Sequence, residues 1–279
     1  MSGGPGTGGV LYVVSTPIGN LGDMTLRAIE TLRSVATILA EDTRHSRKLL
    51  DHFAIETPLL AYHEHNEAKA TPGLVSRLQR GESLAIITDA GTPLLSDPGA
   101  RLVSAAIDAG VRIVPIPGAS ALLAALVAGG LPAERFTFFG FLERKGKERE
   151  RAIAELRRLP HTAVLYESPN RLADTLAELT ESGLAERRAA VGRELTKQFE
   201  ETTRGTVAEL ARYYENVPPR GEVVIVIEGA RDTGPTEETL RERARALRAG
   251  GATSRDIVGV LMDELGAPRN LAYRLAHEP

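Results

Sequence analysis

The chain has 279 residues, 42% of them hydrophobic, and a formal net charge of -3. It contains no cysteine, which excludes disulfides, iron–sulfur clusters, thiolate zinc sites and cysteine nucleophiles. The small net charge excludes a protein that grips nucleic acid over its whole surface, and the length favours two domains with separate cores.

The start of the chain, MSGGPGTGG, has no basic segment followed by an apolar one, as a signal peptide would. We expect residues 1–9 to be a flexible tail. No apolar run in the sequence reaches the length of a membrane span. These features predict a cytoplasmic protein.

From residue 10 onward, short apolar runs alternate with helical patterns. The runs that we expect to be strands are residues 10–14, 36–40, 59–62, 84–88 and 112–116. A helical pattern follows each of them, which is typical of βαβ units with a parallel sheet. We therefore expect an N-terminal α/β domain over residues 10–130.

A second set of runs begins after GGLP. The expected strands are residues 136–141, 162–167, 189–195, 200–205 and 222–229, with helices from about Lys147 and Pro169. The short spacing of the last three strands predicts hairpins and a mixed sheet. Residues 131–230 therefore form the second expected α/β domain.

Residues 235–279 carry only helical patterns. The expected helices are 237–249, 257–265 and 269–276, and the second is opened by Thr253 with Asp256 at capping-box spacing. The last two resemble a helix-turn-helix. Seven arginines are matched by seven acids, which favours a solvated helical appendage or a dimer contact over a reader of nucleic acid.

Polar, glycine-rich loops follow the strands of the first domain. They read STPIGNLGD, AEDTRHSR, YHEHNE, DAGTPLLSDPG and PGASA. The carboxyl ends of parallel strands meet at one edge of a sheet, where open α/β folds bind ligands, so these loops predict a site for a small polar ligand. The sequence has no G-x-G-x-x-G, P-loop or nucleophile elbow. His63 and His65 lack a third ligand, so no metal is expected.

Together with FFGFL, YESPNR, GRELTKQFEE and GEVVIVIEG, these loops resemble the tetrapyrrole methylase superfamily. Within it they are similar to the bacterial small-subunit (16S) ribosomal RNA cytidine 2′-O-methyltransferases, over residues 10–229. The resemblance implies two α/β domains with a cleft between them, S-adenosylmethionine as methyl donor, no other cofactor, and a homodimer that acts on ribosomal RNA. The G-D-P of the common superfamily pattern is Gly91-Thr92-Pro93 here, as expected for the RNA branch.

The resemblance also implies roles for single residues. The donor-binding set is Asp89, Gly91, Thr92, Leu95, Ser96, Ser120, Ala121, Tyr166, Glu167 and Leu195. The substrate-binding set is Asn20, Arg44, Arg47, Lys48, Glu64, Asn66, Arg144, Lys145 and Lys147. Arg44, Arg47 and Lys48 share one helix face by their spacing. A charged run such as RKGKERER is by itself more typical of a solvated helix, and the resemblance makes RNA contacts of Arg144, Lys145 and Lys147 alone.

Methyl transfer to a ribose hydroxyl is an in-line displacement that a positioned base speeds by about 10²–10⁴. Asp42, Glu64 and His65 are the candidate bases, and Asp42 and His65 are preferred. Asp42 would alternatively cap its helix, and His65 would alternatively stack on RNA. Two other functions stay open. A porphyrin or corrin methylase would need a broad apolar trough, and a donor-binding sensor with a helix-turn-helix tail would need a basic tail.

Overall fold

The computed structural model describes residues 8–230 and 237–278, and the chain divides into two compact units. The first unit covers residues 1–229 and the second residues 230–279. Most of the expected N-terminal tail, and residue 235 where the helical appendage is expected to begin, lie outside the described residues.

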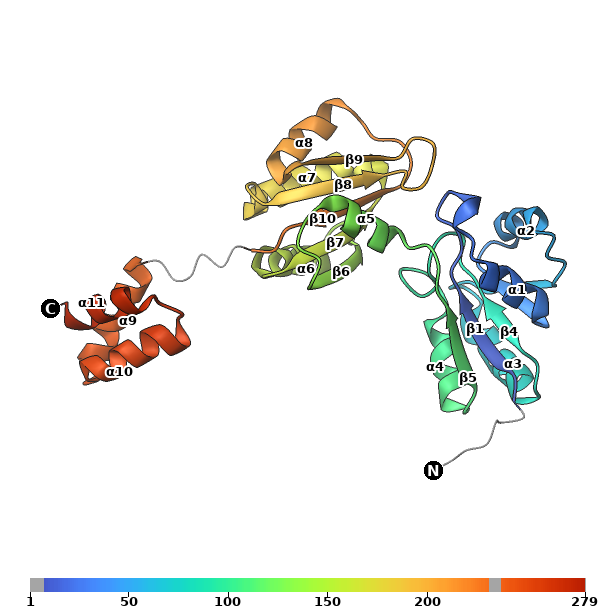
Figure 1. The fold of residues 1–279 in the computed structure, drawn as a ribbon, viewed down its shortest axis with the longest axis horizontal. Helices are drawn as coiled ribbons and strands as arrows, with labels where there is room; N and C mark the ends of the chain where they lie inside the picture. The colour runs from blue at the N-terminus through green and yellow to red at the C-terminus, as the bar shows by residue number, and fades with distance from the viewer. Residues whose placement is uncertain (1–7, 231–236, 279) are drawn as a thin grey trace. The chain divides into compact units, whose positions relative to one another are not determined.

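The first unit begins with a parallel five-stranded sheet of order β3-β2-β4-β1-β5 (Figure 1). Its strands are β1 (Val10–Val14), β2 (Thr37–Ala40), β3 (Leu59–Ala61), β4 (Leu84–Ile86) and β5 (Arg112–Ile116). The helices between them are η1 (Leu21–Asp23), α1 (Leu26–Ser34), α2 (Thr43–His52), α3 (Glu67–Gln79) and α4 (Ala100–Asp108). The predicted βαβ pattern is confirmed.

Helices cover both faces of this sheet. Leu32 of α1 and Leu50 of α2 pack on one face, and Leu78 of α3 and Leu102 of α4 pack on the other. Because both faces are covered, every residue of β2 and β4 is buried. Since all five strands run in the same direction, the polar loops that follow them lie at one edge of the sheet.

A second sheet, of order β6-β7-β10-β8-β9, completes the first unit. Its strands are β6 (Phe136–Phe141), β7 (Thr162–Glu167), β8 (Arg188–Arg193), β9 (Glu201–Thr206) and β10 (Val223–Ile227). Its helices are α5 (Ala121–Gly129), α6 (Lys147–Arg158), η2 (Pro169–Arg171), α7 (Leu172–Leu179), the π-helical turn η3 (Thr180–Leu184) and α8 (Val207–Asn216). β6 and β7 are parallel and the other neighbours antiparallel, which confirms the mixed sheet.

Strand β10 divides the core between the two faces of this sheet. Ile225 and Ile227 pack with α6, α7 and α8, whereas Val224 and Val226 pack with α5. By its packing α5 therefore lies with the second sheet, although the sequence places it in a first domain that ends at residue 130. The helix reads ALLAALVAG, apolar nearly all round, so its pattern does not indicate which sheet it covers.

The expected run of hairpins at the end of this unit is only partly right. β8 and β9 pair antiparallel, but helix α8 separates β9 from β10, and those two strands are not neighbours. Thr206 and Glu209 form a capping box at the start of α8. That helix-start signal follows directly on the expected strand at 200–205 and was readable in the sequence.

The second unit contains α9 (Glu237–Ala249), α10 (Ser254–Gly259), the π-helical turn η4 (Val260–Glu264) and α11 (Arg269–His277). They enclose a small core that includes Leu240, Leu261 and Leu275. Thr253 and Asp256 form the predicted capping box. Within the described ranges, no helix has the length and apolar character needed to cross a membrane. The predicted fold class, two α/β sheets followed by C-terminal helices, is confirmed.

Candidate functional site

A pocket of about 310 Å³ lies in the first unit, where loops of the first sheet meet the second sheet. Its volume is at the lower end of the range for small organic ligands. Five acidic residues line it, namely Glu41, Asp89, Asp97, Glu167 and Glu222, and the last of them lies 3.3 Å from the Lys197 ammonium group. Apolar and aromatic residues also line it, namely Ile18, Ala121, Phe141, Tyr166, Val223 and Val224.

All the residues of the predicted donor-binding set line this pocket except Ser120 and Leu195. The Ser120 hydroxyl caps α5 by accepting a hydrogen bond from the Leu123 backbone N–H at 3.5 Å. Leu195 is buried in the same apolar cluster as the pocket residue Ile18. The fold thus brings the other residues of the predicted donor-binding set together around one pocket. The role of each residue remains a prediction.

Hydrogen bonds lock three loops of the first sheet to one another. The backbones of Thr16 and Gly91 exchange N–H···O bonds of 2.8 and 3.1 Å. The hydroxyls of Ser15 and Thr92 lie 3.0 Å apart, and Thr92 donates to the Ala119 carbonyl at 3.2 Å. The loops after β1, β4 and β5 are therefore held together, and the Thr92 hydroxyl is engaged in the hydrogen bonds that join them.

The loop after β4 is strained where it borders the pocket. Leu94 and Ser96 adopt left-handed backbone conformations, with φ of 73° and 68°. Such conformations cost a non-glycine residue about 1–3 kcal/mol and persist only where their surroundings hold them. Gly140 of β6 has φ of 64°, and a Cβ there would lie 2.9 Å from the Ser96 Oγ. Only glycine lets the second sheet approach this loop so closely.

The carboxylates of Glu41, Asp89 and Asp97 repel one another, and His63 offsets part of this repulsion at Glu41. Partial burial and the carboxylates of Asp97 and Asp89 raise the pKa of Glu41. Burial, followed by the charge of Asp89, raises the pKa of Asp97. Among the ion pairs of the described residues, none joins Glu41, Asp89 or Asp97 to an arginine or lysine. A cationic ligand would therefore be favoured here, because it would neutralise this repulsion.

Aromatic side chains form the apolar part. The Tyr166 ring meets the rings of Phe138 and Phe141 edge to face, at centroid distances of 4.9 and 5.6 Å. Phe141 is 55% exposed although it lines the pocket. A flat heteroaromatic group is well suited to such a surface.

Asp42, a predicted catalytic residue, acts in this structure as the N-cap of α2. Its Oδ1 accepts hydrogen bonds from the backbone N–H groups of Arg44 and His45 at 2.8 and 3.4 Å. A hydrogen bond from the Arg44 side chain, 3.3 Å from Oδ2, contributes most to lowering the pKa of Asp42. A carboxyl group with a lowered pKa is a weaker base, so the geometry favours the capping alternative.

The YHEHNE loop is shaped by Asn66. Its Oδ1 accepts from the His63 backbone N–H at 2.9 Å, and its Nδ2 donates to the Ala61 carbonyl at 3.0 Å. Glu64 and His65 are exposed, and the His65 ring lies 6.0 Å from that of His63. Asn20 plays a similar local part by accepting from the Gly22 N–H at 2.9 Å. Both asparagines thus use their carbonyl oxygens to shape loops.

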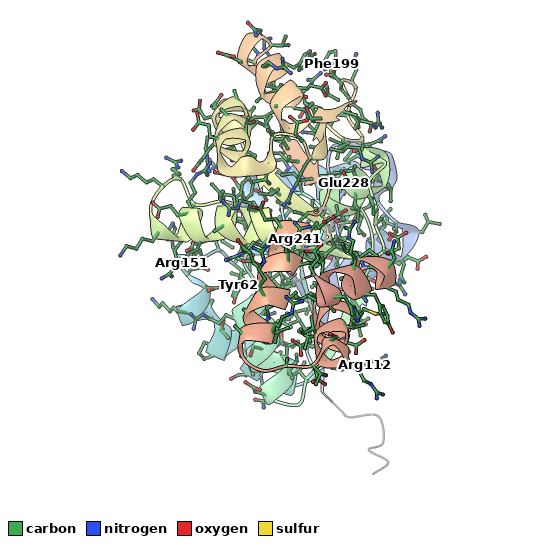
Figure 2. The ribbon with its side chains drawn as sticks, turned by 90° about the vertical axis from the view of Figure 1, so that its left-hand side faces the viewer. Tyr62, Arg112, Arg151, Phe199, Glu228 and Arg241 are labelled. Carbon is green, nitrogen blue, oxygen red and sulfur yellow. The ribbon has the colours of Figure 1, made fainter. Side chains whose placement is uncertain are left out.

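The predicted substrate-binding cations fall into two exposed groups. The first is on α2, where Arg44 is 91% exposed at the side chain, Arg47 lies 4.0 Å from Asp51, and Lys48 is exposed. The second, Arg144, Lys145 and Lys147, surrounds the start of α6. Further along this helix, Arg151 extends into solvent (Figure 2).

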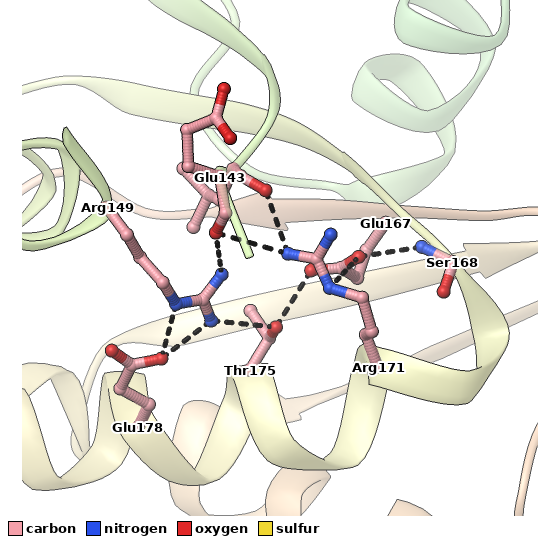
Figure 3. A network of polar contacts seen from close by, with 8 residues as sticks. Glu143, Arg149, Glu167, Ser168, Arg171, Thr175 and Glu178 are labelled. Carbon is pink, nitrogen blue, oxygen red and sulfur yellow. Dashed lines mark hydrogen bonds and ion pairs between the residues drawn. The ribbon is translucent and has the colours of Figure 1, made fainter. Parts of the chain in front are cut away.

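Glu167 lines the pocket, but its carboxylate is engaged elsewhere (Figure 3). Oε1 accepts from the Ser168 backbone N–H at 2.8 Å and lies 3.3 Å from the Arg171 guanidinium. Oε2 accepts from the Thr175 hydroxyl at 2.8 Å. The side chain is 1% exposed, so it stabilises the second sheet rather than offering a free carboxylate to a ligand.

Some residues that line the pocket were not among the site residues predicted from the sequence. Asp97 lies in the DAGTPLLSDPG loop itself, and Phe141 ends the FTFFGF run, so both were within reach of the motifs. Glu41 lies in the AEDTRHSR loop, and Glu222 and Val223 lie in GEVVIVIEG, so these three were also within the quoted motifs. In the part of the chain that the structure describes, no group of three or more His, Asp or Glu side chains is placed to hold a metal ion.

Comparison with known proteins identifies similar chains. The family model of the Tetrapyrrole (Corrin/Porphyrin) Methylases matches residues 10–211. A curated protein of Synechocystis sp., named Ribosomal RNA small subunit methyltransferase I, is 46% identical over 273 residues, which are 97% of this chain and 98% of that protein. The protein of the same name from Bacillus subtilis is 41% identical over 96% of this chain and 94% of its own length.

Solved structures share the fold of the first unit. The uroporphyrin-III-C-methyltransferase of Thermus thermophilus is 22% identical, with a TM-score of 0.56, over 79% of this chain and 94% of that one. A diphthine synthase is 14% identical, with a TM-score of 0.61, over 79% of this chain and 89% of its own. At these identities the likeness shows the fold alone.

Proposed function

The chain belongs to the tetrapyrrole methylase family, and from this premise we propose that it is an S-adenosylmethionine-dependent methyltransferase of small-subunit (16S) ribosomal RNA. The group that it methylates is the ribose 2′-hydroxyl of a cytidine. The reaction breaks the bond between sulfur and methyl, forms a bond between the ribose oxygen and methyl, and releases the hydroxyl proton.

One observation carries this proposal. The Synechocystis relative, named for an action on small-subunit ribosomal RNA, matches at 46% identity over 97% of this chain, including the C-terminal helices. The structures of porphyrin methylases match only at the level of fold. The polar loops that follow the strands of the first sheet agree with this proposal, since they provide no broad apolar trough for a tetrapyrrole.

The pocket residues fit the donor in charge and in shape. The carboxylates of Glu41, Asp89 and Asp97 suit its cationic methionine part, and Tyr166 and Val223 offer an apolar surface to its adenine. When bound, the donor supplies a methyl group already activated by a positive sulfur. The protein's contribution is to hold that group and the ribose oxygen at reacting distance in a site from which water is excluded.

Within this proposal, the exposed arginine and lysine side chains bind the RNA. Arg44, Arg47 and Lys48 project from α2, which begins directly after the pocket residue Glu41. Arg144, Lys145 and Lys147 follow the pocket residue Phe141 along the chain. Contacts with phosphates would position the target ribose, as expected for a structured RNA. Both groups are close in sequence to the pocket, which supports this assignment.

The proton acceptor is assigned from its position relative to the pocket and from the direction of its pKa shift. Asp42 and His65 are the preferred candidates from sequence, Glu64 is the third, and Glu41 joins them because it lines the pocket. The raised pKa of Glu41 makes it a stronger base than Asp42, whose pKa is lowered by Arg44. Within the proposal Glu41 and His65 are therefore the preferred acceptors, and Asp42 mainly holds the end of α2 beside them.

The proposal includes a homodimer that works in the cytoplasm. Leu123 and Val127 of α5 support a self-contact, since they are 51% and 76% exposed on the helix face turned away from the second sheet. Sedimentation at micromolar concentration tests the dimer. A single species with the mass of two chains is expected, and a species with the mass of one chain would contradict this part of the proposal.

The decisive experiment is methyl mapping. Small ribosomal subunits from a strain that lacks this activity are incubated with the protein and S-adenosylmethionine carrying a labelled methyl group. The expected label lies on one cytidine ribose and makes the adjoining phosphodiester resistant to alkali. Label on a base, or on a porphyrin in a parallel reaction and not on RNA, would overturn the proposed function.

A further inference from the structure

Arg149 of α6, which is buried, and Arg171 of η2, which is 26% exposed at the side chain, belong to one continuous polar network (Figure 3). Arg149 is 8% exposed at the side chain, and all three of its guanidinium nitrogens are engaged. Nε donates to the Glu178 carboxylate at 2.7 Å, and the second nitrogen lies 2.6 Å from the same carboxylate and 3.1 Å from the Thr175 hydroxyl. The third donates to the Glu143 carbonyl at 2.8 Å.

Arg171 clamps the same short segment from the other side. It donates to the Leu142 carbonyl at 2.8 Å, and its Nε lies 3.3 Å from the Glu167 carboxylate. Thr175 bridges the two halves, because it donates to Glu167 and accepts from Arg149. Two guanidinium charges are thus balanced by the two carboxylates of Glu167 and Glu178.

The clamped carbonyls stand at the base of the loop 143–146, which follows β6 and precedes α6. This loop and the first residue of α6 carry Arg144, Lys145 and Lys147, all exposed. Three like charges on one short segment repel one another and disfavour a single conformation. Burying a charge is expensive unless it is paired. Here each ion pair has one buried member, Arg149 or Glu167, and the two arginines also bind the backbone of that segment.

We propose that Arg149 and Arg171 are positioning residues that order the cationic segment 143–147 before RNA arrives. They do not touch RNA themselves. Because the backbone of the segment is already held, it need not be ordered at the moment of binding, and affinity for RNA rises by the backbone entropy that is saved. Glu167 and Tyr166 are neighbours at the end of β7, so the same network fixes the segment relative to the donor pocket. This inference rests on the proposed function.

The test is steady-state kinetics on unmethylated small subunits with Arg149→Met, which keeps the apolar stem and removes the guanidinium. The KM for the subunit should rise by about tenfold, as expected when the backbone of a short loop must be ordered on binding. The kcat and the Kd for S-adenosylmethionine should stay within about twofold of the wild-type values. Arg151→Met is the matched control, since it removes an exposed charge from the same helix and should change none of these quantities.

Two further measurements separate positioning from general stability. Trypsin should cleave after Arg144 and Lys145 faster in Arg149→Met than in Arg151→Met, with other sites unchanged. In a protein with Arg144→Ala, Lys145→Ala and Lys147→Ala, adding Arg149→Met should raise the KM no further, because the effect acts through those cations. Thr175→Val, a milder change to the same network, should move the KM in the same direction if Arg149→Met does not fold.

The outcomes distinguish the inference from its premise. If the triple variant raises the KM for the subunit but Arg149→Met and Thr175→Val do not, positioning is wrong and the proposed function stands. An additional KM increase from Arg149→Met in the triple-variant background would also overturn positioning. If the wild-type protein methylates no RNA, the proposed function fails and the inference fails with it.

Discussion

Carboxylates at the edge of the first sheet and the carboxylates of Glu167, at the end of β7, and Glu178, on α7, have opposite surroundings. Glu41, Asp89 and Asp97 face one pocket without a basic partner among the ion pairs of the described residues. Glu167 and Glu178 are held by Arg171 and Arg149. Acids that the protein leaves uncompensated are available to a cationic ligand, whereas acids that it pairs internally fix the structure around that ligand.

The largest effect that this comparison predicts is on stability, at Glu167. Glu167→Ala leaves Arg171 without its buried partner and the Thr175 hydroxyl without its acceptor, so it should lower the free energy of unfolding by about 3–5 kcal/mol. Urea denaturation measures this change. The exposed Glu155→Ala on α6 is the control and should shift the free energy by less than about 0.5 kcal/mol. A loss below about 1 kcal/mol at Glu167 would mean that the pairing contributes little to stability.

The next effect is on donor binding, at Asp97. Asp97→Asn removes a negative charge facing the pocket and should weaken S-adenosylmethionine binding by about 10- to 100-fold, the value of a charged interaction. The melting temperature should stay the same or rise, because the raised pKa of Asp97 shows that its charge is disfavoured in the folded protein. Titration calorimetry and thermal melting measure the two quantities.

Asp108→Asn, on the exposed end of α4, is the matched control for Asp97 and should change neither quantity. If Asp97→Asn lowered stability and left the donor affinity unchanged, the prediction would be wrong. Asp97 would then be a structural carboxylate like Glu167 rather than a donor-binding one.

The smallest effect is on the pH profile. A base works only when it is deprotonated. On acidification the rate constant therefore begins to fall near the pKa of the base, and it then falls by about tenfold per pH unit. If Glu41 is the acceptor, the acid limb of kcat/KM for the donor, which reports the free protein, lies above the usual range of a glutamate, because its pKa is raised. If Asp42 is the acceptor, the limb lies below the usual range of an aspartate, because its pKa is lowered. Glu41→Gln should remove the limb in the first case and leave it in place in the second.

Local patterns in the sequence were sufficient to predict much of this molecule. The parallel sheet follows from apolar runs that alternate with helices, and the pocket follows from loops that must share one edge of that sheet. The motif DAGTPLLSDPG indicated the frame in which Thr92 now joins two loops. The capping box of Thr253 and Asp256 was readable for the same reason, since both partners lie within one turn.

Features that depend on distant partners were not predictable from the sequence. The side on which α5 packs depends on Val224 and Val226, about a hundred residues further along the chain. Arg149 looked like one more exposed cation of RKGKERER, and only the fold reveals Glu178 and Thr175 around it. The pairing of Glu167 with Arg171 and Thr175 is likewise invisible in the motif YESPNR, which had suggested a ligand contact.

The most direct test of the account is a crystal structure of the protein with S-adenosylmethionine bound. The account predicts that the sulfonium and amino groups lie beside Glu41, Asp89 or Asp97, with the adenine against Tyr166 and Val223, while Glu167 keeps its contacts with Arg171 and Thr175. A donor bound outside this pocket, or bound with Arg171 released from Glu167, would contradict the account. In either case the unpaired pocket carboxylates would not be the ones that bind the donor, or the paired carboxylates would not be structural.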